Sequence, residues 1–234
     1  MNSGLFSQPA RMAGFLGIGF IVLFVASAIG QGETPMSTDS ADEIRSFFVD
    51  NRDQYLIADF ITGIALVFFF LPFAACLRHV LAGAEGEPGV CSRLFFSGAI
   101  LTLAIGAAGA AGLGTLAMAA GDESINDSSL KLMMYASEYG FSGIGFGFAL
   151  VAVSASIVMI TTGVVAKWVG YVGVATAAIN LVGATWIIDG DPEGVLCLIS
   201  LIGFLAFGIW VLCTSVMLLR QPQTSAATMA PAAA

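Results

Sequence analysis

Six long stretches of the chain carry no charged side chain, and short segments rich in charge separate them. These stretches run over residues 12–31, 60–77, 94–121, 139–166, 168–188 and 194–219. A helix needs about 20 mainly apolar residues to cross a hydrocarbon core about 30 Å thick. Continuous apolar runs, instead of strict alternation, exclude a transmembrane β-barrel. The pattern therefore predicts an all-α, polytopic transmembrane bundle of six helices.

The spans form one predicted domain over residues 1–220, and the remaining residues 221–234 read as a disordered tail. That tail is rich in Ala, Thr, Gln and Pro and buries too little apolar surface to order itself. One alternative stays open for the first span, because Arg11, an apolar stretch and Ala26-Ser27-Ala28 also match a secretory signal with its cleavage site. Cleavage would leave five helices. We place the six spans at 12–31, 57–78, 94–120, 139–163, 168–188 and 195–219.

Basic residues between the spans predict the orientation of the chain. Five fall on the side of the termini and three on the other side. By the positive-inside rule, both the N-terminus and the C-terminus are expected in the cytoplasm. The first group is Arg11, Arg78, Arg93, Lys167 and Arg220, and the second is Arg45, Arg52 and Lys131.

The largest external segment lies between the first two spans and contains an amphipathic pattern over about residues 41–55. Ser40 and Glu43 have the spacing of a capping box, with Ser40 as N-cap. Ile44, Phe48 and Tyr55 then fall on one helical stripe. The segment predicts a short helix lying at the membrane surface, or else an extension of the second span into water.

Composition supports the membrane assignment and excludes one class of partner. Hydrophobic residues make up 58% of the chain and charged residues 10%, against about 25% charged in ordinary soluble domains. The mean hydropathy is +0.92 and the isoelectric point about 4.4. Nucleic acid is not an expected partner, because phosphate binding needs clustered Lys and Arg. The lipid bilayer is the first expected partner.

Small residues predict where the helices pack closely. The third span alternates Gly and Ala, with Gly106, Gly109 and Gly112 at its centre, and the fourth contains Gly143 and Gly147. Helices in lipid associate mainly through such close backbone approach. We expect these glycines in helix–helix contacts. An alternative is that they line a pore or a ligand crevice.

Three polar residues near the outer ends of spans are the candidate ligand-binding residues. Asp59 begins the second span, Glu138 the fourth, and Asn180 lies in the outer half of the fifth. Ionisable groups inside a membrane are costly unless satisfied and often mark function. The three side chains are expected either to converge on one outward-facing pocket or to act separately. In the second case the carboxylates are solvated at the interface and Asn180 bridges helices.

Several kinds of chemistry lack their residues in this sequence. His79 is the only histidine, so the paired histidines of a membrane zinc protease are missing. The four cysteines form no C-x-x-C pair, and no phosphate-binding loop is present. We therefore expect no catalytic residues, no metal site and no cofactor, and we predict that the protein is not an enzyme.

Four short segments carry a resemblance to known sequences. They read FFVDNR at 47–52, ACLRHVLAGAEG at 75–86, KWVGYVG at 167–173 and FGIWVLCTSV at 207–216. Together they resemble a group of six-helix integral membrane proteins, frequent in actinobacteria, whose function is unknown. The resemblance implies a multi-pass protein of a bacterial plasma membrane, with no activity and no functional residues to carry over.

Two functional hypotheses follow from the sequence. The first is a non-enzymatic scaffold or accessory subunit that binds lipid, another membrane protein or a second copy of itself. The alternative is a small transporter or channel with an outward-facing polar pocket around Asp59 and Glu138.

Overall fold

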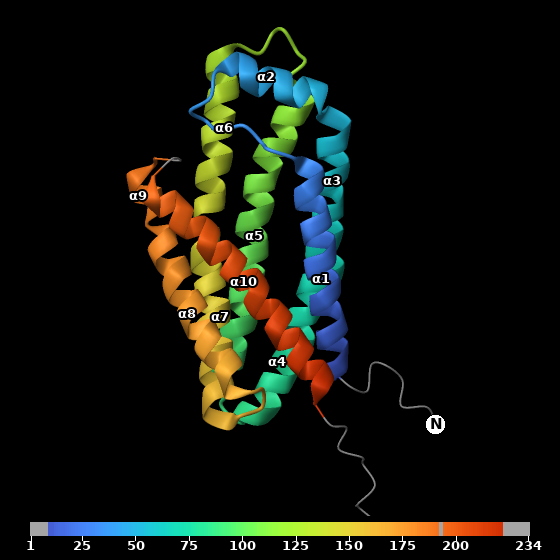
Figure 1. Cartoon of the computed structure of the whole chain (residues 1–234), viewed down its shortest axis with the longest axis vertical. Coiled ribbons are helices and arrows are strands. Elements are labelled where there is room, and N and C mark those ends of the chain that lie inside the picture. The colour runs from blue at the N-terminus through green and yellow to red at the C-terminus, as the bar shows by residue number, and fades with distance from the viewer. Residues whose placement is uncertain (1–8, 192–193, 222–234) are drawn as a thin grey trace, which may run out of the picture.

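The computed structural model describes residues 9–191 and 194–221, which form a bundle of long helices (Figure 1). The described residues contain no β-strand, and six helical runs are long and apolar enough to cross a membrane. This confirms the predicted fold class. The runs are α1 (Pro9–Gln31); α3 (Arg52–Ile64) with η2 (Ala65–Phe70) and α4 (Leu71–Glu85); α5 (Val90–Ala119); α6 (Asp127–Ser142) with α7 (Ile144–Thr162); α8 (Lys167–Ala184) with α9 (Trp186–Asp189); and α10 (Val195–Arg220).

Several helices extend beyond the charge-free stretches. The fourth run begins at Asp127, well before residue 139, because Asn126 caps it there by accepting a hydrogen bond from the Ser129 N–H at 2.9 Å. A charge-free stretch marks only the part of a helix that can lie in the hydrocarbon core of the membrane. The backbone hydrogen bonds continue into water wherever a cap and local packing support them.

Pro72 is accommodated by a local change of helix type. It has no N–H to donate to the carbonyl of Phe68, four residues earlier. The residues just before it, Ala65–Phe70, form a π-helical turn, in which the Leu71 N–H donates to the Leu66 carbonyl. The second span therefore remains one continuous helical run.

The bundle has two different ends. Figure 1 shows the end where α1 begins and α10 finishes, which we call the terminal end. Large apolar side chains fill the interior there. Phe73, Leu77, Phe95 and Trp210 are fully buried there. The last described residue, Gln221, donates from Nε2 to the Val164 carbonyl at 2.5 Å. Gln221 was predicted to begin the disordered tail, and the rest of that predicted tail, residues 222–234, lies outside the described residues.

At the opposite end, which we call the capped end, α2 (Ala41–Asp50) lies across the bundle (Figure 1). The predicted capping box is confirmed, since Ser40 and Glu43 bond each other reciprocally at its start. Ile44 and Phe48 of α2 pack against residues of α3, α5 and α6 in one buried cluster. Residues from Arg52 onward already belong to the second span, so only 41–50 of the expected 41–55 form the surface helix.

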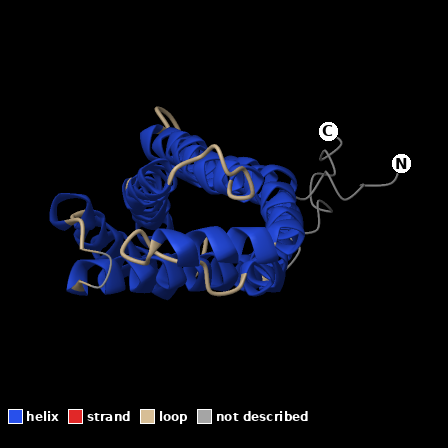
Figure 2. Ribbon diagram, turned by 90° about the horizontal axis from the view of Figure 1, so that it is seen from above, coloured by secondary structure: helices blue, strands red, loops and turns tan. Residues whose placement is uncertain are grey.

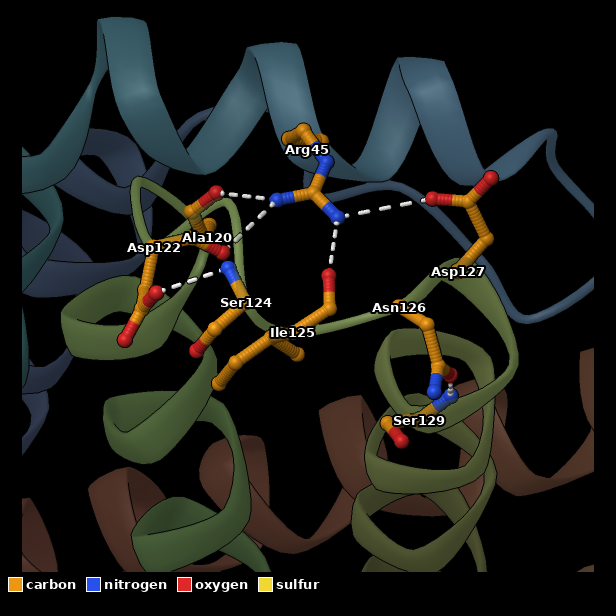
Figure 3. A network of polar contacts seen from close by, with 8 residues as sticks. All are labelled: Arg45, Ala120, Asp122, Ser124, Ile125, Asn126, Asp127 and Ser129. Atoms are coloured by element: carbon orange, nitrogen blue, oxygen red, sulfur yellow. Dashed lines mark hydrogen bonds and ion pairs between the residues drawn. The ribbon is translucent and has the colours of Figure 1, made fainter.

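Arg45 fastens α2 to the loop between α5 and α6 (Figure 3). Its guanidinium donates to the carbonyls of Ala120 at 2.7 Å and Ile125 at 2.6 Å, and it lies 3.4 Å from the Asp127 carboxylate. In the same loop, hydrogen bonds from Ser124 hold the pKa of Asp122 below its usual range, helped by the nearby charge of Arg45. The fork of the guanidinium suits this role, because it can serve several acceptors at once.

The glycines of α5 and α7 that were expected to pack lie in different surroundings. Gly109 faces the Phe141 ring and Gly112 faces Ser137, both across the α5–α6 contact. Gly147 lies directly against Thr102 of α5. A Cβ on any of these three would meet an atom closer than 3.0 Å. Gly143, at the junction of α6 and α7, and Gly106 have looser neighbours, from 3.4 Å outward, and Gly106 also borders an empty space described below.

Candidate functional site

A large cavity occupies the middle of the bundle, toward the capped end. Its volume is about 1080 Å³, and its walls come from α1, α3 with η2, α5, α6 with α7, α8 with α9, and α10. The end-on view shows the helices of the bundle arranged in a ring (Figure 2). Most of the lining is apolar. Pockets for drug-sized ligands measure about 300–1,000 Å³, so this cavity is large enough for a longer molecule.

Over residues 104–111, the face of α5 toward the cavity carries almost no side-chain bulk. Ala104, Ala107 and Ala111 recur on that face at helical spacing, with Gly106 beside them, and all border the cavity. The neighbouring face, with Gly109 and Gly112, is in close contact with α6. One face of α5 thus packs on α6, and another borders the cavity.

Aromatic side chains close the cavity toward the terminal end. Phe20 of α1 lies 5.1 Å from Phe70 of η2, and Phe148 of α7 stacks on Phe207 of α10 at 4.1 Å between ring centroids. Phe70 and Phe207 join the two pairs at 6.2 Å. These four residues, which we call the aromatic floor, separate the cavity from the packed interior of the terminal end.

The cap closes the other end of the cavity. Tyr55 and Leu113 belong both to the lining and to the buried cluster beneath α2. Glu138 of α6 binds the segment 32–40, which joins α1 to α2. The Ser37 N–H donates to Oε1 of Glu138 at 2.7 Å, and the Ser37 hydroxyl donates to Oε2.

The side of the cavity between α1 and α10 faces outward from the bundle. The two helices cross near the terminal end, where Gly14 lies against Leu219, and they separate toward the capped end (Figure 1). Phe24 and Phe204 still touch, with ring centroids 5.5 Å apart. Val25 and Leu201 line the cavity and are also 51% and 54% exposed. In a membrane, this side would contact lipid chains.

Asp59 is the one acidic residue on the cavity wall, as far as the described residues show. Its side chain is half-buried, and it makes no hydrogen bond or ion pair with another described residue. Tyr55 and Thr62 lie about one turn before and after it on the same helix face, and both also line the cavity. Within the described chain, no Lys, Arg or His side chain borders the cavity.

The three residues proposed from sequence do not form one site. Asp59 and Asn180 both border the cavity, whereas Glu138 lies outside its lining and binds Ser37. Asn180 also bridges two helices, because its Nδ2 donates to the Thr176 carbonyl of α8 and to the Gly203 carbonyl of α10, each at 2.9 Å.

Most of the other residues that line the cavity could not be identified from the sequence. The aromatic floor is assembled from four segments far apart in the chain, so spacing along the sequence could not reveal it. The Ala repeat at 104, 107 and 111 was a legible signal, since it marks one helix face without bulk. Within the described residues, no group of three or more His, Cys, Asp or Glu side chains could hold a metal ion.

Comparisons with protein-family models, with curated proteins and with solved structures found no match to this chain.

Proposed function

We propose that this multi-pass membrane protein binds a lipid-like, amphipathic molecule in its intramembrane cavity. The observation that carries this proposal is a cavity of about 1080 Å³ with a predominantly apolar lining, bordered by exposed apolar side chains of α1 and α10. Apolar lining with a few polar groups is the usual composition of a small-molecule site. A molecule already dissolved in the bilayer would enter between these two helices without crossing water.

Binding accounts for the structure better than passage through the membrane. An open channel needs access from both sides at once, whereas the aromatic floor and the packed interior beyond it block the terminal end. The outward polar pocket of the transporter hypothesis also needs Glu138, which is engaged with Ser37. The protein is therefore best understood as a lipid-binding accessory protein of a bacterial plasma membrane.

Binding of a protein partner through the Gly-rich helix faces has less support. Gly109, Gly112 and Gly147 are already in contact with other helices of the same chain. They offer no free surface for a second protein or a second copy. The lipid-binding form of the accessory role is thus the one we put forward.

A pair of neighbouring alanines on α5 provides a matched test. Ala107 lines the cavity, whereas Ala108 is also exposed but lies outside the lining. Ala107→Phe should fill the cavity and Ala108→Phe should only add bulk toward the bilayer. We expect mildly purified wild-type protein and Ala108→Phe to retain a bound lipid in native mass spectrometry, and Ala107→Phe to lose at least nine-tenths of it.

Thermal unfolding in detergent provides a second readout for the same variants. Because a ligand that binds only the folded state raises its stability, added bilayer lipid should raise the Tm of the wild type and of Ala108→Phe, but not of Ala107→Phe. Equal lipid retention by both variants would refute the cavity as the binding site.

A further inference from the structure

We infer that the bound molecule carries a primary amine at its polar end and that Asp59 is its counter-ion. This inference rests on the proposed function and specifies the class of ligand. It follows from the charge of the cavity wall, the hydrogen-bonding groups around Asp59 and the position of Asp59 relative to the rest of the cavity.

The cavity wall carries a carboxylate and no basic side chain among the described residues. The nearest arginine in sequence, Arg52, directs its guanidinium to the Met118 sulfur at 3.4 Å. Ionisable groups within a membrane protein normally pair with each other or with backbone groups. Asp59 has no such partner within the described chain, so the complementary charge is expected from the ligand.

The groups beside Asp59 favour a small donor-rich head group. An ammonium has three N–H donors and no acceptor. The Tyr55 hydroxyl, one turn earlier, makes no hydrogen bond with a described residue and can accept one of these donors. The Thr62 hydroxyl, one turn later, is already engaged with the Ala58 carbonyl and with Ser27. A carboxylate with one free hydroxyl suits an amine better than a phosphate, which needs several donors.

Asp59 lies at the correct end of the cavity for an amphipathic ligand. A Cβ on Gly114 would be 3.9 Å from its Oδ2, which places the carboxylate beside the part of α5 nearest the cap. From Gly114 the cavity continues along Ala111, Ala107 and Ala104 of the same helix toward the aromatic floor. An amine at Asp59 would therefore leave the apolar tail in the alanine-lined part, with its far end at the phenylalanines.

The test compares three single-chain probes of equal length in protein reconstituted into phosphatidylcholine nanodiscs. The probes are hexadecylamine, hexadecanol and hexadecanoic acid, with affinities measured by displacement of a fluorescent fatty amine. The variants are Asp59→Asn and, as a control, Asp53→Asn, which removes an exposed carboxylate from the same helix. Since Asp59 bonds no described residue, Asp59→Asn should fold with an unchanged Tm.

We expect the wild type and Asp53→Asn to bind hexadecylamine at least 10-fold more tightly than either other probe. In Asp59→Asn this preference should fall to 2-fold or less. Equal affinities in the wild type, or a preference that survives in Asp59→Asn, would overturn the assignment of the amine.

Ala107→Phe separates failure of this inference from failure of the proposed function. If all probes bind the wild type equally and Ala107→Phe abolishes their binding, the cavity is the site but the head group is not selected. If no probe binds, or if Ala107→Phe has no effect, the cavity proposal fails and the amine assignment fails with it.

Discussion

At the scale of single residues, a small chemical change is expected to have its largest effect where a glycine lies against a neighbouring helix. Gly183 of α8 lies so close to α10 that a Cβ would be 2.6 Å from the Cα and 2.9 Å from the N of Ser200. Both of these atoms belong to the backbone, so neither can rotate away. The two helices can approach this closely only because residue 183 has no side chain.

We predict that Gly183→Ala lowers the free energy of unfolding by about 1–3 kcal/mol, because overpacking forces α8 and α10 apart. Gly83→Ala is the matched control, since Gly83 is also helical and has no atom within 4 Å of its Cβ position. Alanine is the better helix former, so the control should be neutral or up to about 1 kcal/mol more stable. Thermal unfolding in the same detergent measures both. A harmless Gly183→Ala would contradict the close α8–α10 contact.

At the scale of elements, α2 shows how a short helix is held on the end of a bundle. Its apolar stripe packs on α3, α5 and α6, and Arg45 binds carbonyls of the α5–α6 loop on the other side of the contact. The Ser40–Glu43 capping box holds the start of α2, and those hydrogen bonds keep the pKa of Glu43 below its usual range. The cap remains in place through carbonyl acceptors more than through ion pairs.

We predict that Arg45→Lys loosens α2 almost as much as Arg45→Gln. The Ala120 and Ile125 carbonyls bind two different nitrogens of the planar guanidinium, and the single nitrogen of an ammonium cannot occupy both positions. Hydrogen bonds to charged groups contribute about 1.5–3 kcal/mol, so amide exchange in α2 should accelerate about 10- to 100-fold. Asp127→Asn should change the rate of amide exchange in α2 by less than about 5-fold, because an exposed ion pair contributes about 0–1 kcal/mol. Hydrogen exchange with mass spectrometry resolves these cases. If amide exchange in α2 stays slow in Arg45→Lys, a positive charge at residue 45 is sufficient to hold α2 in place.

At the scale of the whole molecule, the even number of spans places both described ends of the chain on one side (Figure 1). Five basic residues lie toward that side and three toward the cap. In a bacterial plasma membrane this difference predicts that the terminal end faces the cytoplasm and that α2 and the Glu138–Ser37 contact face outward. The cavity would then face lipids of the outer leaflet.

Reporter fusions test this orientation. We expect a fluorescent protein joined after residue 221 to fluoresce, because it would remain in the cytoplasm, and alkaline phosphatase at the same position to be inactive. Phosphatase inserted in the loop between α5 and α6 should be active. The reverse pattern at both positions would show that the five-to-three difference in basic residues does not direct this chain.

The sequence by itself determined the class of fold and the helices, because the need to satisfy backbone hydrogen bonds in lipid acts on each span alone. The capping box at Ser40 and Glu43 was legible for the same reason, since it depends on neighbours within a few residues. How far the helices extend beyond the membrane was less predictable. The sequence does not distinguish Asn126, which caps α6, from the rest of the charged loop around it.

Only the tertiary structure decided which polar residues share a site. In the sequence, Asp59, Glu138 and Asn180 are all polar residues in the outer parts of spans. In the structure, Asp59 and Asn180 border the cavity, whereas Glu138 binds Ser37. The two faces of α5 likewise both consist of small residues, and one packs on α6 while the other borders the cavity. Such differences depend on which helices meet, and that depends on contacts between residues far apart in the chain, such as Phe20 with Phe70 and Phe148 with Phe207.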